Sequence, residues 1–394
     1  MARTDIYNPS SDHQALRELV RTFAEREVEP QAHEFNAAER FNRPLFDRLG
    51  ALGLLGITVD ERFGGSGLDA VAAVIAHEEL GAADAGFTLS YLAHAMLYAN
   101  NVNVNANDDQ RDRWLPGACS GAEIGGMCMS EPGAGTDVMG MRTTAVRRGD
   151  AYVLNGTKMW ITNGAVSDTE LGDVFLVYAK TEDAGGKALS SFLVRKGTPG
   201  FSLGQRLKDK LGMRSSPTAE LVFEDVEIPA ADRLGADGRA TLCMMRNLEL
   251  ERLTLAAMSL GIARRAIEIM NRYASDRQSF GRPLRDYGQI QRHVAESYAE
   301  FMAGRAYVYS VAGQIDLTRA GNRVDSDGVK LYASTMAKNV ADRAIQVLGG
   351  FGYMGEYTVE RLWRDAKLLE IGGGTLEAHH KNMTRDLQSL ERIR

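Results

Sequence analysis

Residues 248–273 read LELERLTLAAMSLGIARRAIEIMNRY and carry one continuous helical pattern. Apolar side chains recur there at intervals of three and four, which is the spacing that builds one buried face of an α-helix. The same spacing returns over residues 289–317, over 326–348 and in a shorter run from about Thr375. Apolar helices of this length usually pack side by side. The final part of the chain is therefore predicted to form a helical bundle.

The sequence changes in texture on the N-terminal side of this bundle. From about residue 124 to 232 it consists of short runs rich in Val, Tyr, Phe, Thr and Leu, separated by turn residues. Asn155-Gly156, between Tyr152–Leu154 and Lys158–Thr162, predicts a β-hairpin, because Asn-Gly supplies the positive φ angles of a type I′ turn. No ten-residue helical pattern separates these strands, which favours an antiparallel barrel or sandwich over a parallel βαβ sheet.

The chain begins with a further helical region, which runs from residue 11 to about 120. The predicted fold class is therefore α+β, with several domains. We expect an N-terminal all-α domain over residues 1–123, a middle antiparallel β-barrel-like domain over 124–235 and a C-terminal four-helix bundle domain over 236–394.

Composition excludes several classes of protein. The 46 Lys and Arg against 52 Asp and Glu give a formal net charge of −6, and no basic block is present, so nucleic-acid binding is not expected. The longest uncharged stretch, Ala85–Asn107, contains five asparagines and a histidine and does not read as a membrane span. Cys119, Cys128 and Cys243 lie far apart and form no zinc or disulfide pattern. We expect a reducing compartment, either a bacterial cytoplasm or the mitochondrial matrix after processing.

Three motifs allow both a binding and a structural interpretation. The loop Ser130–Asp137 exposes backbone amides beside two hydroxyls and two carboxylates, as a ligand-binding loop or a capped domain junction would. Trp160 and Thr162 end a predicted strand, where a tryptophan usually belongs to the core but also stacks on planar heteroaromatic rings. Gly350–Gly355 matches the dinucleotide pattern GxGxxG, yet a predicted helix precedes it where that fingerprint needs a strand. A glycine-rich loop between helices is the favoured interpretation.

Glu251 stands among apolar residues in the run quoted above. If its side chain faces them, desolvation raises its pKa, and a carboxylate tuned in this way serves as a base near neutral pH. If it belongs to the exposed stripe of an amphipathic helix, it has no such role, and the pattern leaves both interpretations open. His77-Glu78-Glu79 and His379-His380 lack metal-ligand spacing and are expected on solvated helix faces, so no metal site is predicted.

The conspicuous motifs occur together in one order: SEPGAGTD (130–137), WITNG (160–164), RQSFGRPL (277–284), QVLGGFGY (346–353) and RDAKLLEIGGGT (364–375). In this combination, from about residue 11 to 390, the chain resembles the acyl-CoA dehydrogenase flavoprotein family. The resemblance implies FAD held between the β domain and the bundle, usually across a subunit interface of a homotetramer. It implies α,β-dehydrogenation of an acyl-CoA, in which the β-hydrogen leaves as hydride to the flavin and the electrons pass on to electron-transferring flavoprotein.

The resemblance also implies roles for individual residues by their position in the motifs. The residues expected to bind FAD are Met127, Met129, Ser130, Gly135, Thr136, Trp160, Thr162, Arg277, Phe280, Gln346, Gly349, Gly350, Thr375 and Glu377. The residues expected to bind the substrate are Thr136, Glu249, Arg252, Gly372, Gly373 and Gly374.

The catalytic base is implied indirectly. Most family members carry a glutamate just before the Gly-Thr of the C-terminal motif, where this chain has Gly373. A minority branch, which includes isovaleryl-CoA dehydrogenases, supplies the glutamate from the first bundle helix, and Glu251 occupies that position. Segments such as FGGSGL (63–68) and KLGMRSSPTAELVFED (210–225) are most similar to those of isovaleryl-CoA dehydrogenases. The resemblance thus implies a short or branched acyl-CoA substrate and a place in leucine catabolism.

The resemblance leaves alternatives and departures. A longer or terpenoid acyl-CoA resembling citronellyl-CoA, or an oxygen-using flavin oxidase or monooxygenase on the same fold, remains an alternative. Tyr287-Gly288 replaces the usual aromatic-Gln pair, which puts one expected FAD contact in doubt. His379-His380 replaces a common pair of arginines, and Leu92 and Ala95, in the expected acyl pocket, differ from the residues expected of an isovaleryl enzyme.

Overall fold

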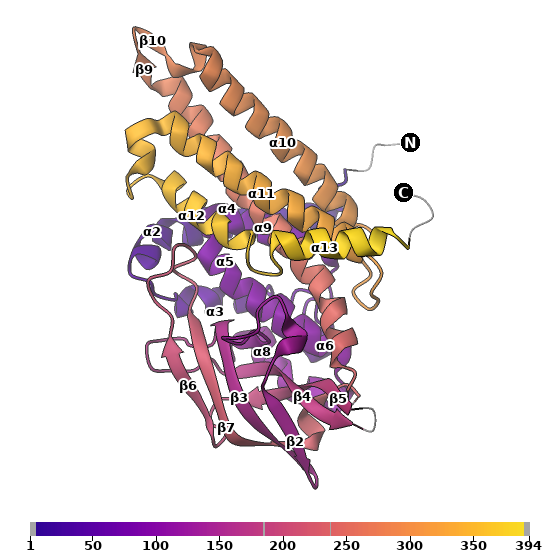
Figure 1. Ribbon diagram of the computed structural model, residues 1–394. Helices are drawn as coiled ribbons and strands as arrows, with labels where there is room; N and C mark the ends of the chain where they lie inside the picture. The colour runs from indigo at the N-terminus through magenta and orange to yellow at the C-terminus, as the bar shows by residue number, and fades with distance from the viewer. Residues whose placement is uncertain (1–4, 184–185, 237, 390–394) are drawn as a thin grey trace.

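The computed structural model describes residues 5–183, 186–236 and 238–389, and the molecule has three parts along one long axis (Figure 1). A helical bundle lies at one end and a β-sheet at the other, and the N-terminal helices lie between them and contact both. Along the chain, helical N- and C-terminal parts flank a strand-rich middle, which confirms the predicted fold class.

The N-terminal helices follow the expected helical region closely. Two π-helical segments, Ala24–Val28 and Ala93–Asn100, join successive helices there without a break in direction. The helices are α1 (Ser11–Phe23), α2 (Glu29–Ala37), α3 (Arg43–Ala51), α4 (Ala70–Ala83), α5 (Ala85–Leu92), α6 (Asn101–Asn105), α7 (Asp108–Trp114) and α8 (Pro116–Ser120).

The middle of the chain forms one sheet, which has eight strands among the described residues. The strands are β1 (Gly125–Cys128), β2 (Thr144–Arg148), β3 (Ala151–Thr162), β4 (Val174–Asp183), β5 (Gly186–Arg195), β6 (Phe201–Arg206), β7 (Thr218–Pro229) and β8 (Arg233–Leu234). Their order is β6-β7-β3-β2-β4-β5-β8, with β1 beside β4. Most neighbours are antiparallel, as expected, but β1 and β2 each pair with β4 in parallel.

The predicted hairpin at Asn155-Gly156 is wrong, because β3 runs through both residues without turning. β3 pairs with β7 on both sides of Gly156, and its register shifts there, which marks a β-bulge. A Cβ at Gly156 would lie 2.4 Å from Oγ1 of Thr143, so the close approach of another segment requires glycine. The true hairpin joins β2 to β3 at Gly149-Asp150.

The C-terminal bundle contains the predicted long helices and one more. Its helices are α9 (Ala240–Asp276), α10 (Gly288–Ala312), α11 (Arg323–Leu348), α12 (Thr358–Leu369) and α13 (Leu376–Leu387). The additional helix is α12, whose apolar pattern is too short to stand out from its flanking glycine-rich loops. A small hairpin of β9 (Gln278–Ser279) and β10 (Arg282–Pro283) lies at the far end of the bundle (Figure 1). Across the part of the chain that the structure describes, no helix is both long and apolar enough to span a bilayer.

The sequence GxGxxG at Gly350–Gly355 follows the end of α11, as expected. Gly349–Tyr353 forms a 3₁₀ turn that leads from α11 toward α12, and no strand precedes it. It is therefore a loop between helices and not a dinucleotide-binding motif.

The expectation that His77-Glu78-Glu79 lies on a solvated face is wrong, because α4 is covered on all sides and the three residues are buried. α4 packs so closely on α9 that a Cβ at Gly261 would lie 2.4 Å from the carbonyl oxygen of Glu78. Arginines from α1, α9 and α10 form ion pairs with the two carboxylates, which compensates their lost hydration. These arginines are Arg17, Arg21, Arg264 and Arg305.

Candidate active site

Glu251 lies in the first third of α9, on a face of the helix that is covered by other elements. The residue is 6% exposed. Burial raises the pKa of Glu251 to about 7, against the opposing positive charges of Arg252 and Lys330. Its Oε2 atom has no hydrogen-bond partner among the described residues. A carboxylate that is partly ionised at neutral pH and keeps one oxygen free is suited to accept a proton.

The turn Gly372–Gly374, between α12 and α13, faces Glu251. A Cβ at Gly373 would lie 3.5 Å from Oε1 of Glu251 and only 2.2 Å from Cδ1 of Leu255. Gly373 and Gly374 have φ angles of 69° and 99°, a region that favours glycine. A side chain at position 373 would therefore enter the space next to the Glu251 carboxylate, and glycine keeps that space free of one.

Arg252, next to Glu251, takes part in a buried charge cluster that sequence patterns did not indicate. Nη1 of Arg252 lies 2.9 Å from Oδ1 of Asp327 on α11, and Nδ1 of His379 on α13 lies 2.6 Å from the same oxygen. The expectation of solvated faces is therefore wrong for His379, which is buried, and holds for its neighbour His380, which is exposed. Asp327 stands between Ser326 and Gly328 in a polar stretch, so the local sequence carries no signal of a buried carboxylate.

Lys330 is a second charged residue inside the protein, and no motif of the sequence distinguishes it. Its Nζ donates hydrogen bonds to the carbonyl oxygen of Leu369 and, at 3.1 Å, to that of Gly374. Thr375 follows this turn and caps α13, since its Oγ1 accepts a hydrogen bond from the amide of Ala378 at 3.2 Å. Both ends of the glycine turn are thus fixed by side chains.

The loop that follows β1 reaches the same part of α9. Met127 and Met129 pack against the hydrophobic cluster that Leu248 of α9 also joins. Nδ2 of Asn101 donates a hydrogen bond at 3.3 Å to the hydroxyl of Tyr178 on β4. Burial raises the pKa of Tyr178, and the charge of nearby Glu251 adds to that shift. The sheet loop and Glu251 therefore belong to one region.

The loop Ser130–Asp137 is held by a buried carboxylate. Oε1 of Glu131 accepts hydrogen bonds from Oγ1 of Thr143 at 2.5 Å and from Nζ of Lys158 at 2.9 Å. The outer side of the loop is open, because a Cβ at Gly133 or Gly135 would touch no atom within 4 Å. The loop therefore presents accessible backbone amides on a rigid support, an arrangement suited to binding a ligand.

Trp160 and Thr162 lie on β3, beside this loop. The amide of Met159 donates a hydrogen bond to the carbonyl oxygen of Ser130 at 2.9 Å. β3 shifts register between Lys158 and Ile161, and Trp160 there has a φ of 59° and is 56% exposed. Its ring is thus turned out of the sheet core and presents an exposed flat apolar surface, which is suited to stack on a planar ligand.

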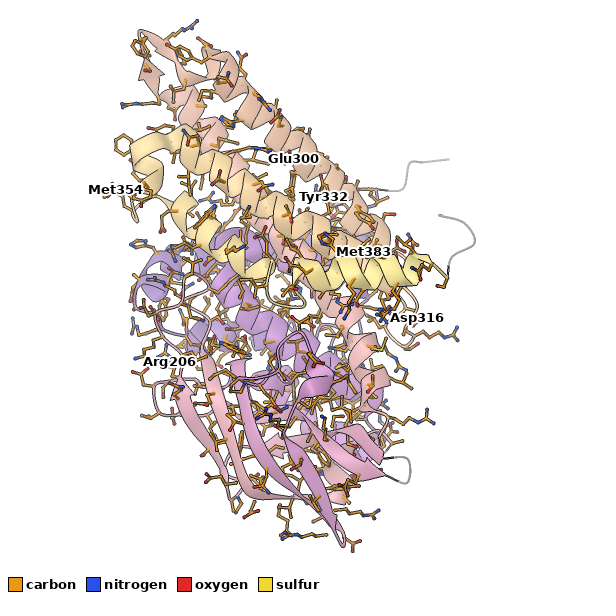
Figure 2. All side chains as sticks on the ribbon, viewed as in Figure 1. Arg206, Glu300, Asp316, Tyr332, Met354 and Met383 are labelled. Atoms are coloured by element: carbon orange, nitrogen blue, oxygen red, sulfur yellow. The ribbon has the colours of Figure 1, made fainter. Side chains whose placement is uncertain are left out.

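Five of the other residues expected to bind FAD lie at the opposite end of the molecule. Arg277, Phe280, Gln346, Gly349 and Gly350 belong to the end of the bundle that carries β9 and β10 (Figure 1). Phe280 stands in the β9–β10 turn and is 97% exposed. Met354, labelled in Figure 2, is also exposed at this end. Within one chain the structure brings the sheet loop and Glu251 together, but not the bundle-end residues.

Glu249 and Glu377 have less central positions. The carboxylate of Glu249 accepts hydrogen bonds from the amides of Gly321 at 3.2 Å and Asn322 at 2.9 Å, so it holds the segment before α11. Glu377 is exposed in the first turn of α13.

Among the residues described, no group of three or more His, Cys, Asp or Glu side chains is arranged to hold a metal ion.

Comparisons with known proteins find matches along nearly the whole chain. Residues 10–122, 126–226 and 241–388 match the family models of the acyl-CoA dehydrogenase N-terminal, middle and C-terminal domains. The mitochondrial isovaleryl-CoA dehydrogenase of Solanum tuberosum is 42% identical over 375 residues, which cover 94% of this chain and 89% of that enzyme.

Solved structures of two bacterial enzymes are similar over the whole chain. Butyryl-CoA dehydrogenase from Megasphaera elsdenii has a TM-score of 0.91 and 34% identity, with 98% of this chain and 99% of that chain covered. A glutaryl-CoA dehydrogenase from Mycobacterium smegmatis in complex with FADH2 has a TM-score of 0.90 and 30% identity, with 98% and 96% covered.

Proposed function

Because the chain belongs to the acyl-CoA dehydrogenase family and is an oxidoreductase of that type, we propose that it converts a short or branched-chain acyl-CoA to the trans-2-enoyl-CoA. In this proposal the substrate resembles isovaleryl-CoA, FAD is the cofactor and Glu251 removes the α-proton. The observation that carries the proposal is the environment of Glu251, which is buried beside a glycine turn and has a pKa near neutrality.

The chemistry of a thioester sets two requirements for these residues. An α-proton is weakly acidic, so the base must be preorganised, and the negative charge that develops on the thioester oxygen must be stabilised. Glu251 meets the first requirement, since burial makes its carboxylate more basic while Arg252 and Lys330 keep part of it ionised. We assign the stabilisation of the thioester oxygen in part to a backbone amide near Gly373.

FAD suits the residues around the sheet loop. The open glycines of the Ser130–Thr136 segment leave room for a ligand against backbone amides, and the exposed ring of Trp160 offers a flat apolar surface. Thr162 follows on the same strand and would bond the edge of the flavin ring. Bound FAD supplies the acceptor for the hydride that leaves the β-carbon. Electron-transferring flavoprotein is the proposed acceptor of its electrons.

The bundle-end residues support a homotetramer in which one subunit completes the FAD site of another. Arg277, Phe280 and Gln346 lie with Gly349 and Gly350 at the end of the bundle, away from the sheet loop of their own chain, and Phe280 is almost fully exposed. We expect sedimentation velocity to give a tetramer. We also expect Phe280→Ser to lower the flavin-to-protein ratio; a monomer that keeps stoichiometric FAD would contradict this assembly.

The glycine turn supports a branched substrate. Gly372 and Gly373 carry no side chains, so the turn adds no side-chain volume next to the proposed base, and we propose that the acyl group carries its methyl branch on this side. A panel of isovaleryl-, 2-methylbutyryl-, butyryl- and citronellyl-CoA, scored by anaerobic bleaching of the flavin, identifies the preferred acyl group. We expect isovaleryl-CoA to bleach fastest. Faster bleaching by citronellyl-CoA would overturn the proposed substrate but would still support the proposed dehydrogenation.

The central experiment replaces the proposed base. Glu251→Gln should bind FAD normally but lose bleaching by isovaleryl-CoA by about 10²–10⁴-fold, the contribution of a positioned base. Glu268→Gln is the matched control, because it makes the same change on the same helix at a residue that lies near Arg265, away from the glycine turn. Fast bleaching by Glu251→Gln would overturn the assignment of the base.

A further inference from the structure

Helix α11 places two oppositely charged side chains, Asp327 and Lys330, inside the protein and one helical turn apart. Both residues have an exposure of 0%. Neither is given a direct task by the proposed reaction, yet their contacts converge on Gly372–Gly374 and on the residue next to Glu251.

Lys330 holds both ends of the glycine turn. It donates to the carbonyl oxygen of Leu369, the last residue of α12, and to that of Gly374. A cation is favourable at this place because the C-terminal carbonyls of a helix carry partial negative charge. Burial lowers the pKa of Lys330 to about 8, while the negative charge of Glu251 opposes that shift. The ammonium group is therefore linked both to the shape of the turn and to the charge of the base.

Asp327 holds two side chains that flank the turn, the guanidinium of Arg252 and the imidazole of His379. Its Oδ1 lies 2.9 Å from Arg252 on α9 and 2.6 Å from His379 on α13. The ring of His379 in turn lies against the glycine turn, since a Cβ at Gly374 would be 3.0 Å from its Cε1. Figure 1 shows α13 crossing α11, and Met383 of α13 is labelled in Figure 2. One carboxylate on α11 thus fixes side chains from two other helices.

Stability alone does not account for this set of buried charges. Apolar replacements of buried ion pairs are often equally stable, because the lost hydration of the charges is not fully recovered. Four atoms of the set, moreover, have no hydrogen-bond partner among the described residues. They are Oε2 of Glu251, Nε of Arg252, Oδ2 of Asp327 and Nε2 of His379. Unsatisfied buried polar atoms beside a proposed base indicate a functional role.

We propose that Lys330 and Asp327 are positioning residues for the dehydrogenation. Lys330 holds the Gly372–Gly374 turn against Glu251, Asp327 holds the flanking arginine and histidine, and the two charges together set the pH range in which Glu251 works. This inference rests on the proposed role of Glu251 as the base.

The direction of each effect follows from the charges around Glu251. The titratable groups of this region are Glu249 and Arg252 of α9, Asp327 and Lys330 of α11, Glu370 after α12, His379 of α13 and Tyr178 of β4. Removing the ammonium group makes Glu251 harder to ionise, so the acid limb of the rate profile moves to higher pH. Neutralising Asp327 leaves the positive charge of Arg252 without its counter-charge. Glu251 is then easier to ionise, so the acid limb of the rate profile moves to lower pH.

The test compares holoenzymes of the wild type, Lys330→Met, Asp327→Asn and the control Lys381→Met, which changes an exposed lysine of α13. The measurement is the rate of anaerobic flavin reduction by limiting isovaleryl-CoA as a function of pH. In Lys330→Met we expect the midpoint of the rate profile to rise by at least about half a pH unit. At a pH below both midpoints, this shift lowers the rate about threefold relative to the wild type. We expect the midpoint to fall in Asp327→Asn and to stay unchanged in the control.

A second readout does not depend on activity. Hydrogen exchange at the amides of Gly373 and Gly374 should be faster in Lys330→Met than in the control, with or without FAD. Faster exchange with unshifted midpoints would mean a purely structural role and overturn the proposal. If Lys330→Met does not fold, the test rests on Asp327→Asn. An unshifted midpoint of the pH profile in that variant overturns the proposal. A wild type that no acyl-CoA bleaches overturns the proposed function itself, a result distinct from bleaching with unshifted midpoints.

Discussion

Replacing Gly373 by alanine tests whether the space beside Glu251 is reserved for its carboxylate. The new methyl group would lie 2.2 Å from Cδ1 of Leu255 and 3.5 Å from Oε1 of Glu251. A left-handed φ costs an L-residue about 1 kcal/mol, and forcing a methyl group into a packed site costs about 1–3 kcal/mol. We therefore expect the free energy of unfolding to fall by about 2–4 kcal/mol in Gly373→Ala.

Urea denaturation of the purified protein measures this loss, and two further variants identify its cause. Gly372→Ala is the matched control, because its methyl group would lie 3.6 Å from the nearest atom, the carbonyl oxygen of Leu368, and no positive φ is involved. Its expected loss is below about 1 kcal/mol. Leu255→Ala removes the clashing atom, so the double variant should be more stable than the sum of the single losses by about 1–3 kcal/mol.

The same methyl group has a functional consequence. It narrows the space next to Glu251, so Gly373→Ala should slow flavin bleaching by isovaleryl-CoA more than bleaching by the straight-chain butyryl-CoA. Two results would refute the reasoning. One is equal stability of the two alanine variants, and the other is strict additivity with Leu255→Ala, because either would mean that the turn has room for a side chain.

Three other predictions concern separate parts of the molecule. The rate of flavin bleaching, followed by stopped flow, should rise with pH through a midpoint near 7, because only ionised Glu251 accepts a proton and burial raises its pKa to about 7. Glu79→Gln should lower the free energy of unfolding at neutral pH by about 3 kcal/mol, since burial opposes ionisation but arginine partners lower the pKa of Glu79 to about 2. That stability is present above about pH 4.5 and is lost as the pH falls through 2, so urea curves of the two proteins should converge there. Gly156→Ala should displace Thr143 from Glu131, because its methyl group would lie 2.4 Å from Oγ1 of Thr143, and should lower the FAD content measured by absorbance.

The parts of the fold that the sequence predicts depend on local patterns. The long runs of three-and-four spacing became α9, α10 and α11, because a helix that packs on one side must repeat its apolar residues at that interval. The strand-rich middle was recognisable because short runs rich in Val, Tyr, Phe, Thr and Leu alternate there with turn residues. Glu251 was a candidate base in the sequence, but whether it faced the interior depended on what covers α9, and only the packed structure gives that.

The errors come from contacts between segments far apart in the chain. Asn155-Gly156 reads equally well as a turn or as a bulge, and the outcome depends on pairing with β7, more than 60 residues later. His77-Glu78-Glu79 looks like a solvated stripe because its compensating arginines lie on other helices. Charged residues inside a helical pattern are thus ambiguous in a single sequence, because they belong either to a solvent-exposed face of the helix or to a buried network of ion pairs.

The pairing of Glu251 with Gly373 links the proposed base to the proposed substrate. A carboxylate at each position would bring two like charges into one space, which would raise the pKa of at least one of them and leave it protonated at neutral pH. One carboxylate must therefore come from either α9 or the turn. When it comes from α9, the turn carries no side chain, and the nearest atoms at Gly373 belong to Leu255 and to the Glu251 carboxylate. In the proposed reaction the acyl group therefore meets Glu251 and Leu255 on this side and no side chain of the turn, and a change at Gly373 should alter stability and acyl preference together.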